Sequence, residues 1–320
     1  MRADKILQKL LQFDSILLLL HENPDGDTLG AASGLYQGLI KKQKKVAMVC
    51  KDLVPRPFLF LPEVGEIKHD LLFGDFQLIV TVDCGDLKRT GFHERLKKFV
   101  RSKKVLINID HHPKNDLHKI ATFNLVDYDA SSTSEIIYHL LFDLDIAIDK
   151  SIATALLTGL YTDTGGFKHS NTTPQTLEIA AELLKNGARI NLITKNVSLN
   201  KSIPAMRLWG LTLSRLHHNN ELKIVSSVIT RKDLIACKAN EDDIAGVVNL
   251  INTVPEANAA ILFYETEEGM IRASVRTENE KVDVSQLANI FGGGGHRKAS
   301  GFTLDGKLKI NGANWEIILK

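Results

Sequence analysis

Acidic and imidazole side chains crowd a short turn near the start of the chain. The segment His21 to Asp27 reads His-Glu-Asn-Pro-Asp-Gly-Asp and joins an apolar run at 15–20 to a helical pattern at 28–40. Two aspartates two positions apart, Asp25 and Asp27, repel each other unless a cation lies between them. The turn therefore predicts a cation site. The alternative is an ordinary strand-to-helix loop in which Asp27 caps the helix.

More residues of the same chemistry follow further along the chain. They are Asp83, Asp110, His111, His112 and Asp163. They lie at the ends of apolar or helical runs, and each taken singly is better explained as a turn or loop residue. Taken together they predict a cluster of carboxylates whose charge needs divalent cations. Oxygen and imidazole ligands without thiolate favour manganese, magnesium or iron, and two such cations suit in-line displacement at phosphorus.

The predicted elements would bring these residues together. Apolar runs predict strands at 15–20, 45–50, 77–82 and 104–109. Most of the segments between them are helical, which indicates a parallel sheet with right-handed crossovers. In such a sheet the carboxyl ends of the strands share one crevice. We therefore predict an α/β fold for the first part of the chain, with flanking helices and the polar residues at one sheet edge.

The pattern changes in the last third of the chain. Strand and helix signals from residue 221 onward predict a smaller α+β domain with its own sheet. We place a catalytic, metal-binding domain at 1–190, a helical linker at 191–220 and a substrate-binding domain at 221–320. The active-site cleft is expected between the two domains.

A glycine run in this second domain could approach a ligand closely. Gly293, Gly294 and Gly295 precede His296, and the lack of Cβ atoms lets backbone N–H groups reach a phosphate or a base. On the preceding predicted strand, 270–276, Ser274 alternates with two arginines, one of them Arg276. A flexible loop and a solvated strand face are the alternatives.

Composition narrows the class of protein. Of the 320 residues, 44% are hydrophobic and 24% charged, which is typical of a globular chain, and no apolar run reaches the length of a membrane span. A formal net charge of +2 argues against coating long nucleic acid by bulk charge. Cys50, Cys84 and Cys237 are too few and too scattered for a disulfide framework. We therefore expect a cytoplasmic protein that does not associate with membranes.

Five motifs then resemble one family. They are His21-x-x-Pro-Asp25-Gly-Asp27-x-x-Gly30, Val82-Asp83-Cys84-Gly85, Asp110-His111-His112, Thr162-Asp163-Thr164-Gly165 and Gly292-Gly-Gly-Gly-His296-x-x-Ala299-x-Gly301. In this order they resemble the motifs of the DHH phosphoesterase superfamily and of its associated C-terminal domain. The length of the chain is similar to that of the nanoRNase type, which combines oligoribonuclease and pAp phosphatase activities.

The resemblance implies roles for individual residues. His21, Asp25 and Asp83 would bind one metal, and Asp27, Asp83, His111 and Asp163 the other, with Asp83 bridging. The catalytic pair would be His112, beside the scissile phosphate, and Asp110, which would orient the histidines. Substrate would be bound by Ser132, Thr133, Ser274, Arg276, Gly293, Gly294, Gly295 and His296.

The resemblance also implies an activity. The chain would use two divalent cations, most often Mn(II) in this family with Mg(II) as another option, to hydrolyse di- to pentanucleotides of RNA or DNA to nucleoside 5′-monophosphates. Removal of the 3′-phosphate of pAp would be a second activity. A cyclic-di-AMP or pApA phosphodiesterase and a non-catalytic nucleotide sensor are the alternatives. Family members often form homodimers, so a homodimer is expected.

Overall fold

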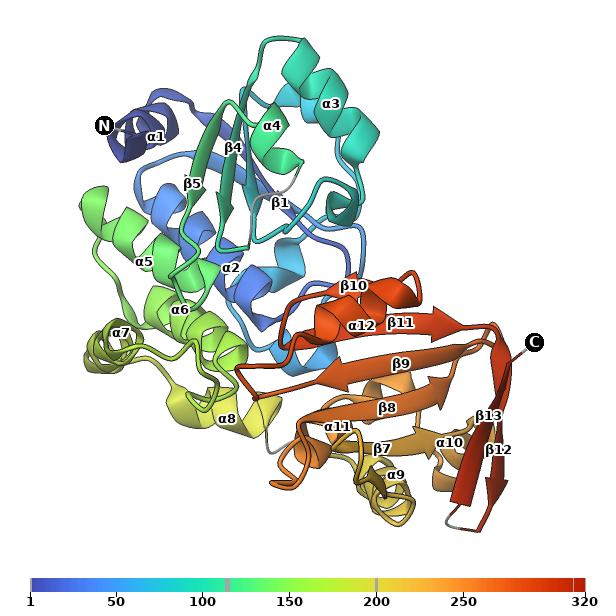
Figure 1. The fold of residues 1–320 in the computed structure, drawn as a ribbon. Coiled ribbons are helices and arrows are strands. Elements are labelled where there is room, and N and C mark those ends of the chain that lie inside the picture. The colour runs from blue at the N-terminus through green and yellow to red at the C-terminus, as the bar shows by residue number, and fades with distance from the viewer. Residues whose placement is uncertain (1, 113–115, 199–200, 313, 320) are drawn as a thin grey trace. The chain divides into compact units, whose positions relative to one another are not determined.

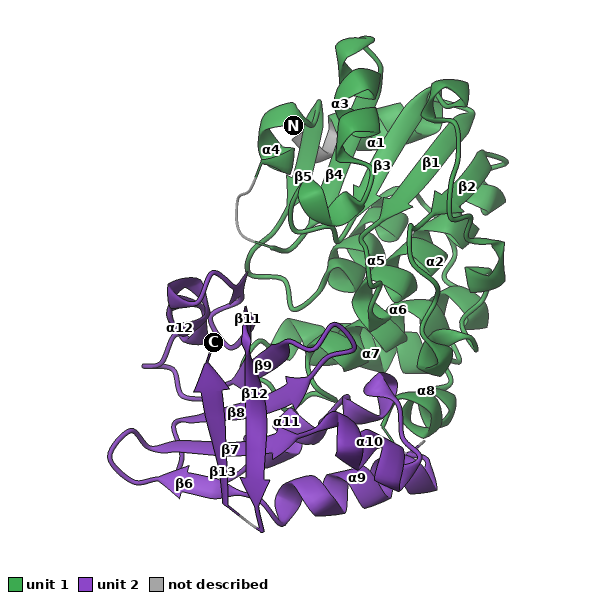
Figure 2. Cartoon of the chain, turned by 90° about the vertical axis from the view of Figure 1, so that its right-hand side faces the viewer, with its two compact units in different colours: residues 1–200 green, residues 201–320 purple. Residues whose placement is uncertain are grey.

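The chain folds into two compact units, residues 1–200 and 201–320 (Figure 2). The computed structural model describes residues 2–112, 116–198, 201–312 and 314–319. The division falls inside the 191–220 segment that the sequence assigns to a linker. Helix α8 (Ile190–Val197) belongs to the first unit. Helix α9 (Ile203–Leu213) belongs to the second, where Leu208 is part of the core. The functional domain limits and the cleft between them stay predictions.

A five-stranded parallel sheet forms the centre of the first unit (Figure 1). Its strands are β1 (Ser15–Leu20), β2 (Lys45–Val49), β3 (Leu78–Val82), β4 (Val105–Asp110) and β5 (Phe123–Val126). They lie in the order β2-β1-β3-β4-β5, and every neighbouring pair is parallel. The predicted α/β parallel sheet is therefore confirmed. The edge strand β5 was not predicted, because it has only four half-buried residues with Asn124 among them.

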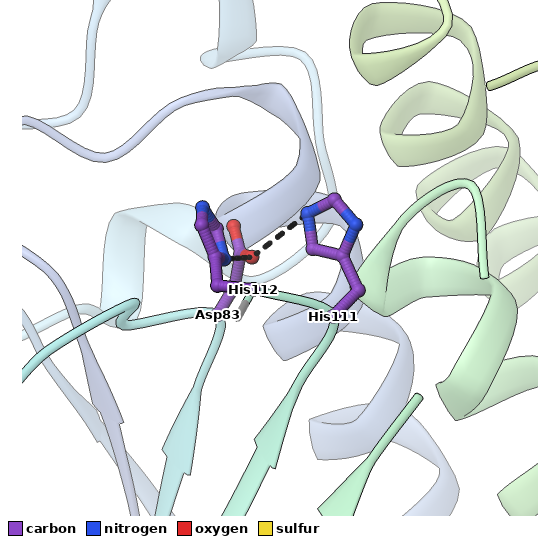
Figure 3. Close-up of side chains that lie close together, drawn as sticks. All are labelled: Asp83, His111 and His112. Atoms are coloured by element: carbon purple, nitrogen blue, oxygen red, sulfur yellow. Dashed lines mark ion pairs between the residues drawn. The ribbon is translucent and has the colours of Figure 1, made fainter. Parts of the chain in front are cut away.

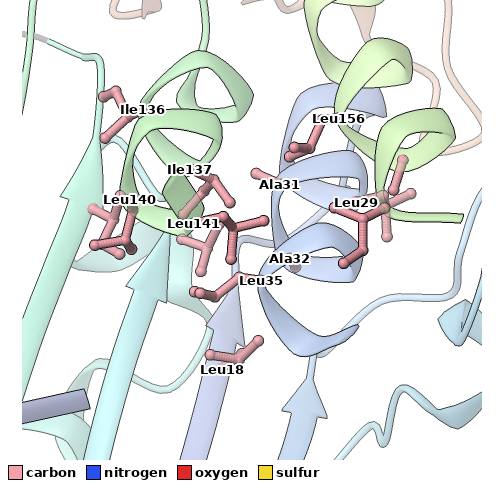
Figure 4. Close-up of a cluster of buried hydrophobic side chains, with 14 of the residues drawn as sticks. Leu18, Leu29, Ala31, Ala32, Leu35, Ile136, Ile137, Leu140, Leu141 and Leu156 are labelled. Carbon is pink, nitrogen blue, oxygen red and sulfur yellow. The ribbon is translucent and has the colours of Figure 1, made fainter. Parts of the chain in front are cut away.

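Helices cover both faces of this sheet. They are α1 (Arg2–Gln12), α2 (Gly26–Lys41), α3 (His93–Arg101), α4 (Leu117–Ile120), α5 (Thr133–Asp143), α6 (Lys150–Asp163) and α7 (Pro174–Lys185), together with α8. Alternate residues of β1 point to opposite faces: Leu18 joins the core under α2, α5 and α6, while Leu19 joins a second core with α3. Figure 4 shows the first of these cores, between the helices and the sheet.

Helices α2 and α6 pack unusually closely. A Cβ atom on Gly30 would lie 2.5 Å from the carbonyl oxygen of Ala155 and 2.9 Å from the backbone nitrogen of Gly159. Both contacts are shorter than real Cβ atoms allow, so the two helices can meet here only because residue 30 is glycine. This contact fixes the position of α6, whose last residue is Asp163.

The second unit has a mixed sheet of its own. Its strands are β6 (His217–Asn219), β7 (Ile224–Ile229), β8 (Ala259–Glu265), β9 (Ile271–Arg276), β10 (Gly294–Gly295) and β11 (Ala299–Leu304), in the order β10-β11-β9-β8-β7-β6. Only the β7–β8 pair is parallel in this sheet as the structure describes it. Strands β12 (Gly306–Asn311) and β13 (Asn314–Leu319) form a separate hairpin. Helices α10 (Arg231–Cys237), α11 (Val247–Ile251) and α12 (Val284–Ile290) join α9 in this unit, which confirms the predicted smaller α+β domain.

Among the described residues, none of the helices combines the length and the apolar character that crossing a membrane requires.

Candidate metal centre

Three neighbouring strands end at the same place in the first unit. His21 follows β1, Asp83 follows β3, and Asp110 is the last residue of β4, directly before His111. The order β1-β3-β4 places these strands side by side. The polar residues therefore meet at the carboxyl edge of a parallel sheet, as the sequence predicts.

The first turn of α2 gives its two aspartates different tasks. Asp25 caps the helix, because its Oδ1 accepts the backbone N–H groups of Asp27 (3.1 Å) and Thr28 (3.0 Å). The alternative in which Asp27 is the cap is therefore wrong. Asp27 instead points away from its own backbone and accepts the N–H groups of Thr133 (2.6 Å) and Ser134 (2.9 Å) in the first turn of α5. It is 1% exposed.

The surroundings of the Asp27 carboxylate favour a bound cation. Burial, followed by repulsion from Asp83 and Asp163, raises the pKa of Asp27 well above its usual range. Two backbone hydrogen bonds hold the carboxylate in place, yet its neighbours are further carboxylates. A divalent cation at this position would remove both the repulsion and the cost of burying the charge.

Asp83 lies at the centre of the cluster and is 2% exposed. Its Oδ2 is 3.9 Å from His21 Nε2. Its Oδ1 is 3.7 Å from His111 Nε2 (Figure 3). The hydroxyls of Thr28 and Thr133 donate to Oδ2 and Oδ1 at 2.7 Å and 2.9 Å. Oδ1 also lies 3.4 Å from His112 Nδ1. Oδ2 therefore faces His21, and Oδ1 faces His111 and His112, which is compatible with a carboxylate that bridges two metals.

The pKa of Asp83 is shifted in the opposite direction to that of Asp27. Burial alone would raise the pKa of Asp83, but a hydrogen bond with His112 and the charges of His112, His111 and His21 hold it well below its usual range. Asp83 is therefore ionised before any metal binds. Its backbone adopts a left-handed conformation with φ of 59°, which is uncommon for a non-glycine residue and is typical of functional turns.

Two histidines present the same ring nitrogen to the cluster. His21 places Nδ1 2.6 Å from the carbonyl oxygen of Glu22, and His111 places Nδ1 3.4 Å from that of Ala130. An Nδ1–H that donates to a carbonyl leaves the Nε2 lone pair free for a metal. His21 Nε2 is 3.8 Å from Asp25, and His111 Nε2 is 3.6 Å from Asp163. The donor atoms thus fit metal binding.

Distances sort these donors into two groups around Asp83. One ligand atom from each of His21, Asp25 and Asp83 lies within 4.8 Å of the others, and the same holds for Asp83, His111 and His112. The first group agrees with the ligand set implied for one metal. The second contains His112 where the resemblance implies Asp27 and Asp163, so the assignment of individual ligands stays a prediction.

Asp110 orients His112. The carboxylate is fully buried; Oδ1 accepts from the backbone and the ring Nδ1 of His112 at 3.0 Å and 2.6 Å, and Oδ2 accepts the N–H of Gly85 at 2.8 Å. Burial would lower the pKa of His112, but hydrogen bonds to Asp110 and Asp83 raise it to about 11. The ring therefore carries a proton, and its Nδ1 is already occupied, which favours a hydrogen-bond donor over a metal ligand.

Of the two substrate residues predicted in this unit, Thr133 contacts the cluster and Ser132 caps a helix. Thr133 donates its hydroxyl to Asp83, as described above. The hydroxyl of Ser132 instead accepts the N–H of Glu135 at 3.2 Å and caps helix α5, with the side chain fully buried. The structure thus gives Ser132 a role in fixing the turn that holds Asp27, and its assignment to substrate binding stays a prediction.

A second group of candidate residues gathers on the sheet of the other unit. Ser274 of β9 pairs with Gly301 of β11, which pairs with Gly294 of β10. Paired residues point to the same face, so Ser274 stands beside a strip of bare backbone. Arg276 lies two positions along the same face, where burial lowers its pKa. A Cβ on Gly293 would collide with the carbonyl of Gly301.

A cavity of about 580 Å³ adjoins this strip and is lined in part by residues 292–294, Arg272 and Gly301. Gly295, with φ of 139°, and the exposed His296 follow the strip along the chain. Ser274, Arg276 and Gly294 therefore share one face of the sheet, beside backbone groups that a phosphate or a base could approach. Gly295 pairs with Ser300, whose partner Val275 belongs to the opposite face. The role of these residues in substrate binding stays a prediction.

Comparison with known proteins identifies the family. Residues 15–160 match the model described as "DHH family, N-terminal domain", and residues 223–318 match the DHHA1 domain. A bifunctional oligoribonuclease and PAP phosphatase NrnA of Thermus thermophilus is 30% identical over 292 residues, which cover 91% of this chain and 84% of the relative. The chain belongs to the DHH family.

Two solved structures have a similar fold. A crystal structure of an exopolyphosphatase-related protein from Bacteroides fragilis is 26% identical, with a TM-score of 0.88 over 96% of this chain and 92% of that one. A crystal structure of exonuclease RecJ bound to manganese is 16% identical, with a TM-score of 0.51 over 95% of this chain and 89% of that one. At this identity the second likeness concerns the fold alone.

Two residues of this DHH-family centre were missed by sequence reasoning. Thr28 donates to Asp83, and the guanidinium of Arg89 lies 3.3 Å from His21 Nε2. Thr28 follows Asp27 directly, but nothing in the sequence indicates that a hydroxyl reaches a carboxylate 55 positions away. Arg89 lies in the same turn segment as Asp83, which was a usable signal, since a phosphate site needs cations beyond its metals.

Metal affinity is expected to fall as the pH falls below 7. Burial, together with repulsion from Asp25 and Asp83, raises the pKa of the metal-free Asp163 carboxyl to about 7, although His111 opposes this. Only the ionised carboxyl binds a metal, so below that pH the metal must displace a proton, and the affinity should drop by about tenfold per pH unit for each proton displaced. Calorimetric titration with Mn²⁺ between pH 6 and pH 8, in buffers of different ionisation enthalpy, measures the affinity and the protons released.

The matched variant is Asp163→Asn, which cannot take up that proton. It should bind metal more weakly and release fewer protons at pH 6 than the unmodified protein. An affinity that does not change between the two pH values would contradict a role for Asp163 as a ligand.

Proposed function

We propose that this DHH-family protein is a two-metal phosphoesterase that hydrolyses di- to pentanucleotides to nucleoside 5′-monophosphates and removes the 3′-phosphate of pAp. The observation that carries the proposal is Asp83, whose two carboxylate oxygens face the Nε2 atoms of His21 and His111 separately. The name of the Thermus thermophilus relative, a bifunctional oligoribonuclease and PAP phosphatase, supports this choice of substrates.

We propose Mn(II) as the metal, with Mg(II) as the second choice. His21, Asp25 and Asp83 would hold one ion, and Asp27, Asp83, His111 and Asp163 the other. A donor set of carboxylate oxygens and imidazole nitrogens without thiolate supports this choice, and so does the manganese in the RecJ crystal structure. When bound, the ions would supply a metal-activated water as nucleophile and would offset the charge of the phosphoryl oxygens.

The side chains of this centre then have distinct tasks. Asp110 keeps the His112 imidazolium in place through the ring Nδ1, so that its remaining N–H donates a hydrogen bond to a phosphoryl oxygen. Asp27 would keep its position through the two N–H groups of helix α5. Burial of Asp83 and Asp110 keeps bulk water from competing for their oxygens.

The second unit would bind the rest of the nucleotide. Arg276 offers a cation, Ser274 a hydroxyl, and Gly293, Gly294, Gly295 and His296 offer backbone and ring donors. An arginine, a hydroxyl and backbone N–H groups are donors that suit a phosphate.

An assay on a panel of substrates tests the proposal. With Mn²⁺, the protein should release nucleoside 5′-monophosphate from a dinucleotide and inorganic phosphate from pAp, and EDTA should stop both reactions because the centre then lacks its cations. Turnover of cyclic-di-AMP or pApA alone would favour the related phosphodiesterase. Binding of nucleotides without turnover of any of them would favour a sensor, and either result would overturn the proposal.

Two further properties belong to the proposal. We infer a cytoplasmic setting, supported by three buried cysteines that are all free thiols. We also expect a homodimer, for which the molar mass in solution is the direct measurement.

A further inference from the structure

Arg89 is anchored to the metal centre through its backbone. It lies in a 3₁₀ turn, Lys88–Thr90, that follows β3. Its carbonyl oxygen accepts the N–H of Glu22 at 2.7 Å, and its own N–H donates to Asp86 at 2.9 Å. The turn after β3 is therefore tied to the turn after β1, beside His21. Both bonds involve backbone atoms of Arg89 and would survive a change of its side chain.

The guanidinium group of Arg89 lies inside the cluster. Nη2 is 3.3 Å from His21 Nε2. Nη1 is 2.8 Å from the place that a Cβ on Gly85 would occupy, and the same place is 3.6 Å from the ring of His112. The group thus lies between a predicted metal ligand, His21, and the imidazolium expected beside the phosphate, His112.

This cation has no carboxylate partner in the described part of the chain. Two acidic side chains of these turns are engaged elsewhere: Glu22 pairs with Lys51 at 2.6 Å, and Asp86 accepts the backbone N–H of Arg89. The bond to His21 is longer than the 2.7–2.9 Å typical of charge-assisted hydrogen bonds. Arg89 is therefore a cation at the centre that lacks a strong anionic partner.

The charges of the metal-loaded centre indicate which anion would pair with Arg89. The carboxylates of Asp25, Asp27, Asp83 and Asp163 would neutralise two divalent cations, and the phosphate of a substrate would add further negative charge. A metal bound to His21 Nε2 would take the lone pair that Arg89 now faces and would repel the guanidinium. The guanidinium then needs an acceptor close by, and a phosphoryl oxygen bound between the metals and His112 offers one with matching geometry.

We propose that Arg89 binds a non-bridging oxygen of the substrate's scissile phosphate, opposite His112. This inference rests on the proposed function, since it concerns the phosphate that the function would cleave. Arg89 is then a substrate-binding residue of the first unit, in addition to the residues on the sheet of the second. The competing explanation is that Arg89 only braces His21 in the metal centre.

Arg89→Ala, Arg89→Lys and the control Lys88→Ala test this inference. Lys88 is exposed and belongs to the same turn, so its removal changes the net charge equally without reaching the cluster. For each variant we would measure Mn²⁺ affinity by calorimetry, binding of inorganic phosphate to the Mg²⁺-loaded protein, and kcat and KM on a dinucleotide. Thermal unfolding reports whether each variant is folded.

Arg89→Ala should keep Mn²⁺ affinity within about twofold, lose about tenfold in phosphate binding, and lose about a hundredfold in kcat/KM. Arg89→Lys should have phosphate affinity and kcat/KM between those of Arg89→Ala and the unmodified protein. A lysine keeps the positive charge but lacks the planar, two-pronged donor geometry of the guanidinium group. Guanidinium ion in the buffer should restore part of the activity of Arg89→Ala. Lys88→Ala should match the unmodified protein in all three measurements.

Two results would overturn the inference. Loss of Mn²⁺ binding in both Arg89 variants would show that the residue braces His21, and phosphate binding equal to that of Lys88→Ala would show that it does not contact phosphate. If Arg89→Ala does not fold, Arg89→Lys carries the same comparison. Absence of nucleotide turnover in the unmodified protein would refute the proposed function instead, while the phosphate titration would still decide the role of Arg89.

Discussion

Replacing Asp83 with asparagine is expected to abolish turnover of every nucleotide, with kcat reduced by about a thousandfold or more. Asparagine has nearly the same shape, but it removes the negative charge that lies between His21 and His111. An amide NH₂ group replaces one of the two carboxylate oxygens. This group cannot bind a cation and cannot accept a hydrogen bond from the hydroxyl of Thr28 or Thr133. Both proposed metal positions lose a ligand at once.

The measurements for this variant are kcat on a dinucleotide and the number of Mn²⁺ ions bound per chain. We expect the stoichiometry to fall below that of the unmodified protein, with the fold retained in circular dichroism. Asp143→Asn is the matched control, because it makes the same chemical change at an exposed residue at the end of helix α5. A variant at residue 83 that keeps both metals and its kcat would refute the bridging role.

The placement of the centre could be predicted because the strands that carry it are plain in the sequence. The runs before His21, Asp83 and His111 are mostly apolar and bounded by polar residues, so their ends are well defined. The rule that parallel strands share one functional edge then brings the three residues together. The structure places them within a few ångströms of each other, and no information beyond the pattern was needed.

The sequence could not predict that Asp25 caps helix α2 while Asp27 accepts hydrogen bonds from helix α5. Either aspartate can cap the helix, because both carry a short acceptor before a helical pattern. The choice depends on the N–H groups of Thr133 and Ser134, which are 106 and 107 positions away from Asp27. Those donors engage Asp27 in the folded state and leave the cap to Asp25. Sequence reasoning has no access to such a distant partner.

The same limitation applies to Arg89 and β5. The side chain of Arg89 belongs to the centre only because its turn bonds to the turn of Glu22, a contact between loops that no periodic pattern reveals. Strand β5 is short and half-buried and extends the sheet beyond β4. Phe123 and Val126 favour strands, but a run of four residues that includes Asn124 is too short to predict one, and its pairing with β4 makes it a strand.

Gly159→Ala is expected to weaken Mn²⁺ binding by about a hundredfold, although the change adds a single methyl group. A Cβ at residue 159 would lie 2.5 Å from Asp27 Oδ1 and would also collide with the hydroxyl of Ser134. Asp27 is held by backbone donors of helix α5, so it has no alternative position that keeps both bonds. The carboxylate, or helix α6 itself, must move by a large fraction of an ångström, which is enough to spoil a metal site.

The free energy of unfolding gives a second measurement, in which Gly159→Ala and a control variant should differ. Alanine is the better helix former by about 1 kcal/mol, but overpacking a buried site costs about 1–3 kcal/mol, so Gly159→Ala should lower the free energy of unfolding. Gly210→Ala is the control: Gly210 lies in helix α9 with nothing within 4 Å of its added Cβ. That variant should be neutral or more stable by up to about 1 kcal/mol.

A second substitution separates the two collisions. Removing the hydroxyl in Gly159→Ala/Ser134→Ala relieves one of them, so part of the lost stability should return. The Mn²⁺ affinity should stay low, because the added methyl group still displaces Asp27. Full recovery of Mn²⁺ binding in the double variant would instead mean that Asp27 tolerates the methyl group, and that the helix contact matters only for packing. The comparison therefore tests whether the lack of a side chain at residue 159 is what leaves Asp27 room in its metal-binding position.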